Sequence, residues 1–176
     1  ATTLKMALES GTYETVSLLT GPEGGLEASE VKSAIQTAGL WPCLKRRPYD
    51  VVANPDAKPK AIYVKGFDTA PLAPDYAFVL KGQASDIQTA LNALTKLTEG
   101  KVYLTLPAKG AATELAAAQN VEKVIMNGPH PASNVSVAIN HIDPINKGEV
   151  VWTMGAEAVI FIGRLMRTGK VDMTRT

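Results

Sequence analysis

A helical pattern and a strand-like run follow one another in this chain with almost no loop between them, and this junction limits the possible folds more than any other feature. The helix is expected to start at Ser85, which has the spacing of a capping box with Gln88, and to stop at Gly100. Its apolar stripe consists of Ile87, Ala90, Leu91, Leu94 and Leu97. The strand-like run 101–106 starts at the next residue. Such short connections are typical of α/β sheets.

The same alternation recurs along the chain. Further helices are expected over 29–38, 111–118, 135–142 and 155–168, and further strands over 61–64, 121–126 and 150–153. Ser29 is expected to cap the first of these helices, and residues 76–80 fit either a short strand or the start of a helix. Repeated strand and helix units predict an α/β fold with a Rossmann-like parallel sheet covered by helices on both faces.

The length of 176 residues fits one domain with a sizeable hydrophobic core. We expect residues 1–28 to form a lead-in arm or short strand and residues 29–176 to form a single Rossmann-like α/β domain. The chain starts without a methionine and ends without a capping signal. It is therefore interpreted as a fragment of a longer subunit.

Composition excludes several classes of function. The 18 basic and 17 acidic residues give a net charge of +1, which argues against nucleic acid as a partner. Cys43 is the single cysteine, so this chain alone cannot form an intrachain disulfide, a cysteine-rich zinc site or an iron–sulfur cluster. Neither of the two histidines, His130 and His141, has metal-ligand spacing with other strong ligands, so no metal site is predicted. The longest apolar run is too short to cross a membrane.

Three loops are expected to gather at one edge of the sheet, where ligands of open α/β sheets bind. They span 40–49, 66–75 and 128–132, and their prolines restrict the backbone. Two prolines are expected to exclude regular secondary structure from the first loop. Candidate residues for the rim of a binding site are Trp41, Arg46, Arg47, Phe67, Asp68, Thr69 and His130.

Each of these residues also has a purely structural explanation. Loop 40–49 can be a solvated basic turn anchored by a buried Trp41, Asp68 can bond its own turn backbone, and His130 can be a surface residue between two prolines. No glycine-rich dinucleotide loop, Walker loop or nucleophile elbow follows a strand. No catalytic residue is therefore assigned.

The loops and several other segments together resemble one family, the A subunit of the sodium-translocating NADH:quinone oxidoreductase. The resemblance covers the chain in order, and its most specific segments are Gly128-Pro129-His130-Pro131-Ala132 and the Asp68-to-Ala73 loop. Other matching segments are Gly39-Leu40-Trp41, Arg47-Pro48, Leu94 to Tyr103, Asp143-Pro144, Val151-Trp152 and Val159 to Leu165. The resemblance implies that this chain is the middle, Rossmann-like portion of that subunit.

The resemblance further implies an oxidoreductase and sodium translocase of the bacterial respiratory chain. The A subunit would lie on the cytoplasmic face of the inner membrane as a peripheral component. Its partners would be the other subunits, especially the membrane subunit on the quinone side, and ubiquinone. The whole complex would carry FMN, FAD, riboflavin and iron–sulfur, whereas no cofactor is expected in this fragment, which by itself would not be catalytic.

The family is in turn similar to the flavin- and NADH-binding subunit of respiratory complex I and to the C subunit of the Rnf complex. Their glycine-rich loops hold flavin mononucleotide, whereas bulky Trp41, Arg46 and Phe67 and several prolines stand in the corresponding loops here. We therefore favour a quinone-side subunit without its own flavin or NADH site. Two alternatives remain, a purely structural docking module and a stand-alone flavin- or dinucleotide-binding α/β oxidoreductase.

Overall fold

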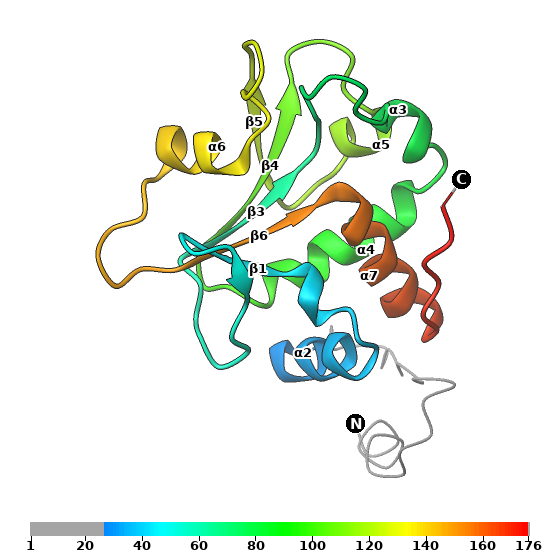
Figure 1. The fold of residues 1–176 in the computed structure, drawn as a ribbon. Coiled ribbons are helices and arrows are strands. Elements are labelled where there is room, and N and C mark those ends of the chain that lie inside the picture. Colours follow the sequence, from blue (N-terminus) through cyan, green and yellow to red (C-terminus); the bar gives the residue numbers. More distant parts are fainter. Residues whose placement is uncertain (1–26, 176) are drawn as a thin grey trace.

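A six-stranded sheet forms the centre of the protein. In the computed structural model, which describes residues 27–175, helices lie on both faces of this sheet (Figure 1). The strand order is β2-β1-β6-β3-β4-β5. The strands are β1 (Lys45–Arg47), β2 (Val51–Val52), β3 (Ala61–Lys65), β4 (Lys101–Pro107), β5 (Glu122–Met126) and β6 (Val151–Gly155). The predicted α/β fold is confirmed, while the arm expected over 1–28 lies outside the described residues except for its last two.

The sheet is parallel over four strands and antiparallel at one edge. Strands β6, β3, β4 and β5 pair in parallel, and β1 pairs antiparallel with both β6 and β2. The prediction that loop 40–49 has no regular structure is wrong, because it contains β1 and the short 3-10 helix η1 (Trp41–Cys43). Pro42 lies in the first turn of η1, where a missing N–H costs nothing, and Pro48 follows β1. The residues between them are free to pair with β6.

Two hydrophobic cores lie on the two faces of the sheet. The α-helices are α2 (Ala28–Thr37), α3 (Tyr76–Val79), α4 (Ala84–Thr95), α5 (Thr113–Ala116), α6 (Val135–Ile142) and α7 (Ala156–Thr168). Helices α4 and α7 pack against each other over one face, and α6 covers part of the other (Figure 1). In β3, Ile62 and Val64 enter the first core, whereas Ala61 and Tyr63 enter the second. This alternation explains why β3 is apolar at successive positions.

Several helix boundaries differ from those predicted. Helix α2 begins at Ala28, and its capping box joins Glu27 to Glu30, so Ser29 is not the cap. Helix α4 begins at Ala84 after a tight turn from α3, so Ser85 lies inside its first turn and forms no capping box. Residues 76–79 are helical, and α5 is much shorter than the predicted 111–118 because the chain turns toward β5.

The connections between strands reverse direction at one point of the sheet. From β3 the chain moves outward to β4 and then β5, with α4 and α5 on the same face. From β5 it returns through α6 to β6, which lies on the other side of β3. The carboxyl ends of β3 and β6 therefore flank the topological switch point, where open α/β sheets usually bind ligands.

Candidate functional site

Two of the three predicted loops meet beyond the carboxyl ends of β3 and β5. The Thr69 N–H donates to Ser133 Oγ at 2.9 Å, and the Ser133 N–H donates to Thr69 Oγ1 at 3.3 Å. The two hydroxyl oxygens are 2.8 Å apart, and Thr69 Oγ1 lies 3.2 Å from Nδ1 of His130. Thr69 and His130, which lie far apart in the sequence, are thus brought together.

Asp68 anchors this group of residues. One carboxylate oxygen lies 2.6 Å from Lys65 Nζ, and the other accepts from the Ala70 N–H at 2.9 Å and from Ser133 Oγ at 3.1 Å. Burial by itself would raise the pKa of Asp68, but these hydrogen bonds and the charge of Lys65 lower that pKa from 3.8 to about 2. Asp68 is therefore an ionised turn residue that fixes both loops.

Sequence reasoning missed two members of this group, Lys65 and Ser133. Ser133 is 3% exposed and bridges Asp68 and Thr69. Lys65 ends β3 and is the first charged residue after four buried apolar ones. A charge at the end of a buried strand was a usable signal for Lys65, whereas nothing local distinguishes Ser133 from an ordinary loop serine.

The two candidate aromatic residues lie in different places: Trp41 is part of a hydrophobic core, and Phe67 lines a cavity. The Trp41 ring packs edge-on against Trp152, with centroids 5.5 Å apart, and its Nε1 donates to the Ala53 carbonyl at 2.7 Å. It therefore belongs to the core beside α4 and α7 and does not reach the predicted rim. Phe67 is 7% exposed and lines a cavity of about 300 Å³ together with Asp68 and Tyr76.

The two candidate arginines lie on β1, and within residues 27–175 neither forms a hydrogen bond or ion pair with the Asp68 carboxylate. Adjacent residues of a strand point to opposite faces, so Arg46 and Arg47 diverge. Arg47 pairs with Asp50 at 3.2 Å and donates to Ser136 Oγ of α6 at 3.3 Å. The Nε atoms of both arginines are buried without a hydrogen-bond partner. The predicted set is thus split, and Trp41, Arg46 and Arg47 do not join the residues around Asp68.

The loop after β5 uses its backbone donors internally. The Ala132 N–H donates to the Pro129 carbonyl and the Asn134 N–H to the Pro131 carbonyl, both at 2.8 Å. The Asn134 side chain caps α6 by accepting from the Ser136 N–H at 2.9 Å. Pro129 and Pro131 have no N–H to offer. The amide donors named here are therefore engaged, and a phosphate group at this loop would have to displace them.

The described residues show no sign of a metal centre or a membrane span. Within residues 27–175, no three His, Cys, Asp or Glu side chains are grouped so that they could hold a metal ion. His130 and His141 are both exposed. In the same part of the chain, no helix has the length and apolar character needed to cross a membrane.

Comparison with known proteins identifies the family. The family model described as "NqrA second alpha/beta domain" matches residues 26–171. The A subunit of the Na(+)-translocating NADH-quinone reductase of Cellvibrio japonicus is 36% identical over 151 residues, which are 86% of this chain and 34% of that protein. The same protein of Saccharophagus degradans is 40% identical over 138 residues, 78% of this chain and 31% of that protein.

A third relative gives the same result, since the corresponding protein of Neisseria meningitidis serogroup A is 38% identical over 150 residues. That match covers 85% of this chain and 33% of the relative. The chain thus spans about a third of the length of these curated relatives. The chain belongs to the family of the second α/β domain of NqrA, the A subunit of the Na⁺-translocating NADH-quinone reductase.

Proposed function

We propose that this chain is the middle, Rossmann-like portion of the A subunit of a membrane-bound sodium-pumping NADH:ubiquinone oxidoreductase. In this proposal it belongs to a peripheral subunit on the cytoplasmic face of the membrane. It serves on the quinone side or as a docking unit, has no flavin or NADH site of its own, and contributes to catalysis only within the complex. Family membership and the names of the relatives support this assignment.

The observation that carries the proposal is the internal use of backbone donors at the strand ends. Flavin and dinucleotide phosphates are held by free N–H groups at helix N-termini and by glycines that let the backbone approach. Here the Thr69 and Ala70 N–H groups are bound by side chains of Ser133 and Asp68, and prolines follow β5. A nucleotide phosphate that cannot form two charge-assisted hydrogen bonds at these loops loses roughly 3–6 kcal/mol of binding free energy, which lowers its affinity by about two to four powers of ten.

The edge of the sheet formed by β2 supports a docking role. Tyr49, Val51 and Val52 are 73%, 49% and 46% exposed, and β2 pairs only with β1 among the described residues. An exposed apolar edge strand is prone to pair with other chains, and partner surfaces commonly cover such edges. We propose that another subunit of the same complex covers this edge.

The test separates the quinone-side role from docking alone. The intact complex is labelled with a photoreactive ubiquinone analogue, and the labelled peptides are mapped. Labelling within residues 27–175 that excess ubiquinone suppresses supports a quinone-side role. Labelling confined to other subunits supports docking alone, and failure of the A subunit to co-purify with membrane subunits contradicts the proposal.

A further inference from the structure

A second cavity, of about 200 Å³, lies at the carboxyl ends of β3 and β6 and joins the topological switch point to the α6 side of the sheet. Its wall includes Lys45, Arg47, Asp50, Lys65, Thr153 and Gly155. It is separate from the cavity beside Phe67, since the two share none of their lining residues. Three of the six residues named are cations.

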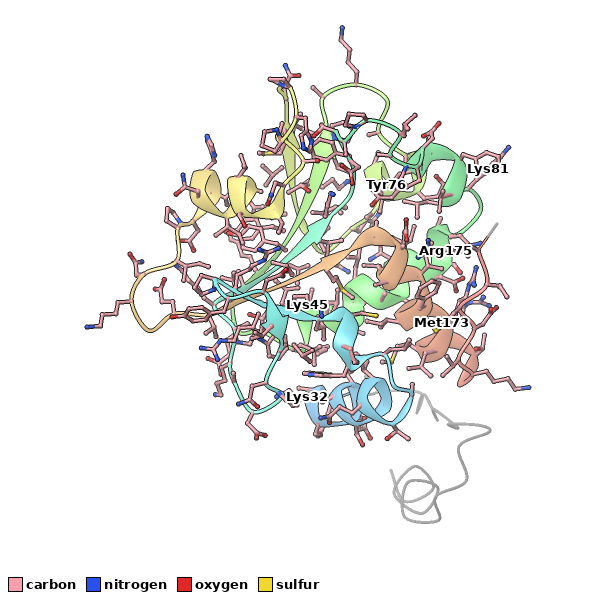
Figure 2. The ribbon with its side chains drawn as sticks, in the orientation of Figure 1. Lys32, Lys45, Tyr76, Lys81, Met173 and Arg175 are labelled. Atoms are coloured by element: carbon pink, nitrogen blue, oxygen red, sulfur yellow. The ribbon has the colours of Figure 1, made fainter. Side chains whose placement is uncertain are left out.

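The strand register explains why these cations converge. Lys45 and Arg47 are two positions apart on β1 and point to the same face, whereas Arg46 between them points to the other. Lys45 pairs with Thr153 of β6, and Lys65 of β3 pairs with Gly155, so the cations come from the two strands that flank β6. Figure 2 labels Lys45, which is the first residue of β1.

The charge of this cavity is not balanced by the protein. Lys65 pairs with Asp68 at 2.6 Å and Arg47 pairs with Asp50 at 3.2 Å. Among residues 27–175, the Lys45 ammonium has neither a salt bridge nor a side-chain hydrogen bond. The buried Nε of Arg47 also lacks a partner. Carboxylates thus pair with two of the three cations, and only one of these carboxylates, Asp50, lines the cavity, so donors remain unused in a partly desolvated space.

The end of β6 is also open. A Cβ atom added at Gly155 would meet no atom within 4 Å, and this residue has φ −86° and ψ 154°, which any residue can adopt. The first acidic residue of α7, Glu157, pairs with Arg175 at 2.6 Å. No carboxylate of the first turn of α7 therefore neutralises the cations of the cavity.

We propose that this cavity binds a small oxyanion of the phosphate type. Lys45 and Arg47 supply the main charge-assisted hydrogen bonds, and Lys65 adds positive charge from the opposite side. The volume of about 200 Å³ lies below the range of about 300–1,000 Å³ that is usual for drug-sized ligands, so a phosphate-sized group fits better than a whole flavin or dinucleotide. The proposal is independent of the quinone-side role.

The test is a titration of the full chain with inorganic phosphate, followed by amide chemical shifts at constant ionic strength, with chloride as the reference. We expect saturable shifts around Thr153 and Gly155. Lys45→Ala should weaken phosphate binding roughly 10- to 100-fold, the loss expected for one charge-assisted hydrogen bond. Lys45→Arg should retain most of the affinity. The matched control is Lys58→Ala, which removes an exposed cation paired with Glu99 and should change little.

A second variant keeps every charge. Gly155→Ala places a methyl group in open space, so it should weaken phosphate binding. Because Gly155 is the N-cap residue of α7, a small fall in melting temperature is expected, and the variant stays informative even where Lys45→Ala unfolds the chain. The affinities for inorganic phosphate and for a soluble short-chain phosphatidic acid are then compared. Tighter binding of phosphate indicates a free anion as the ligand, and tighter binding of phosphatidic acid indicates a lipid headgroup. Equal effects of phosphate and chloride, or equal losses in Lys45→Ala and Lys58→Ala, would overturn the proposal.

Discussion

The Asp68 carboxylate offers a direct check on how the two loops are held together. Its side chain is 20% exposed, and its pKa falls from 3.8 to about 2 in the folded protein. Because the pKa of Asp68 is lower in the folded than in the unfolded state, the ionised carboxylate stabilises the folded protein at pH values above the unfolded pKa. This stabilisation is lost as the pH falls through the folded-state pKa. A shift of this size corresponds to about 2 kcal/mol of folding free energy near neutral pH, with about half left near pH 3 and little near pH 2.

The perturbation that isolates this charge is Asp68→Asn. Asparagine keeps an oxygen that can accept from the Ala70 N–H, but it loses the ion pair with Lys65. Urea unfolding should show Asp68→Asn to be less stable than the parent by about 1–2 kcal/mol at pH 7, and this difference should shrink steadily toward pH 2. Asp56→Asn, at an exposed position of a connecting loop, is the matched control. A difference that stays constant with pH, or no difference at pH 7, would refute the ion-pair argument.

Three further predictions concern packing, charge and assembly. In a urea titration, Gly163→Ala should lower the free energy of unfolding by more than about 2 kcal/mol, because the added Cβ would collide with the Asp86 backbone where α4 and α7 touch. In the control Gly110→Ala, the added Cβ meets no atom, so that variant measures only the effect of a positive φ. Arg47→Glu should lower the melting temperature, because it places a second carboxylate next to Asp50 at a position where the Arg47 side chain is only 22% exposed. An unchanged melting temperature would show that the Arg47–Asp50 ion pair does not stabilise the fold. Val52→Asp, at an exposed edge position, should leave the melting temperature nearly unchanged but reduce co-purification with membrane subunits, and normal co-purification would exclude β2 as the docking edge.

Features with a local cause were predictable from the sequence. The unbroken apolar run of β3 indicated burial on both faces, and Ile62 and Tyr63 indeed enter opposite cores. The last helix was expected to end at residue 168, and α7 does end there, followed by Gly169 in a left-handed conformation. The chain around Thr69 and His130 was expected at the edge of the sheet, because it follows β3 and β5 directly.

Features that depend on distant pairing were not predictable. Strand β1 consists of three cations, and it is a strand because it pairs with the short β2 and, about a hundred residues later in the chain, with β6. That pairing moves Arg47 to the α6 side and leaves Trp41 in the other core. Ser133 contacts Asp68 across 65 positions, which no local pattern encodes.

In the proposed function, the strand-end loops of this chain do not bind a flavin or a dinucleotide. Calorimetric titration of the purified chain with FMN and with NADH measures such binding. The engaged N–H groups of Thr69 and Ala70 and the prolines after β5 predict no measurable binding at micromolar concentrations. A dissociation constant in the micromolar range or below for either nucleotide would contradict the account and favour a stand-alone flavin- or dinucleotide-binding oxidoreductase.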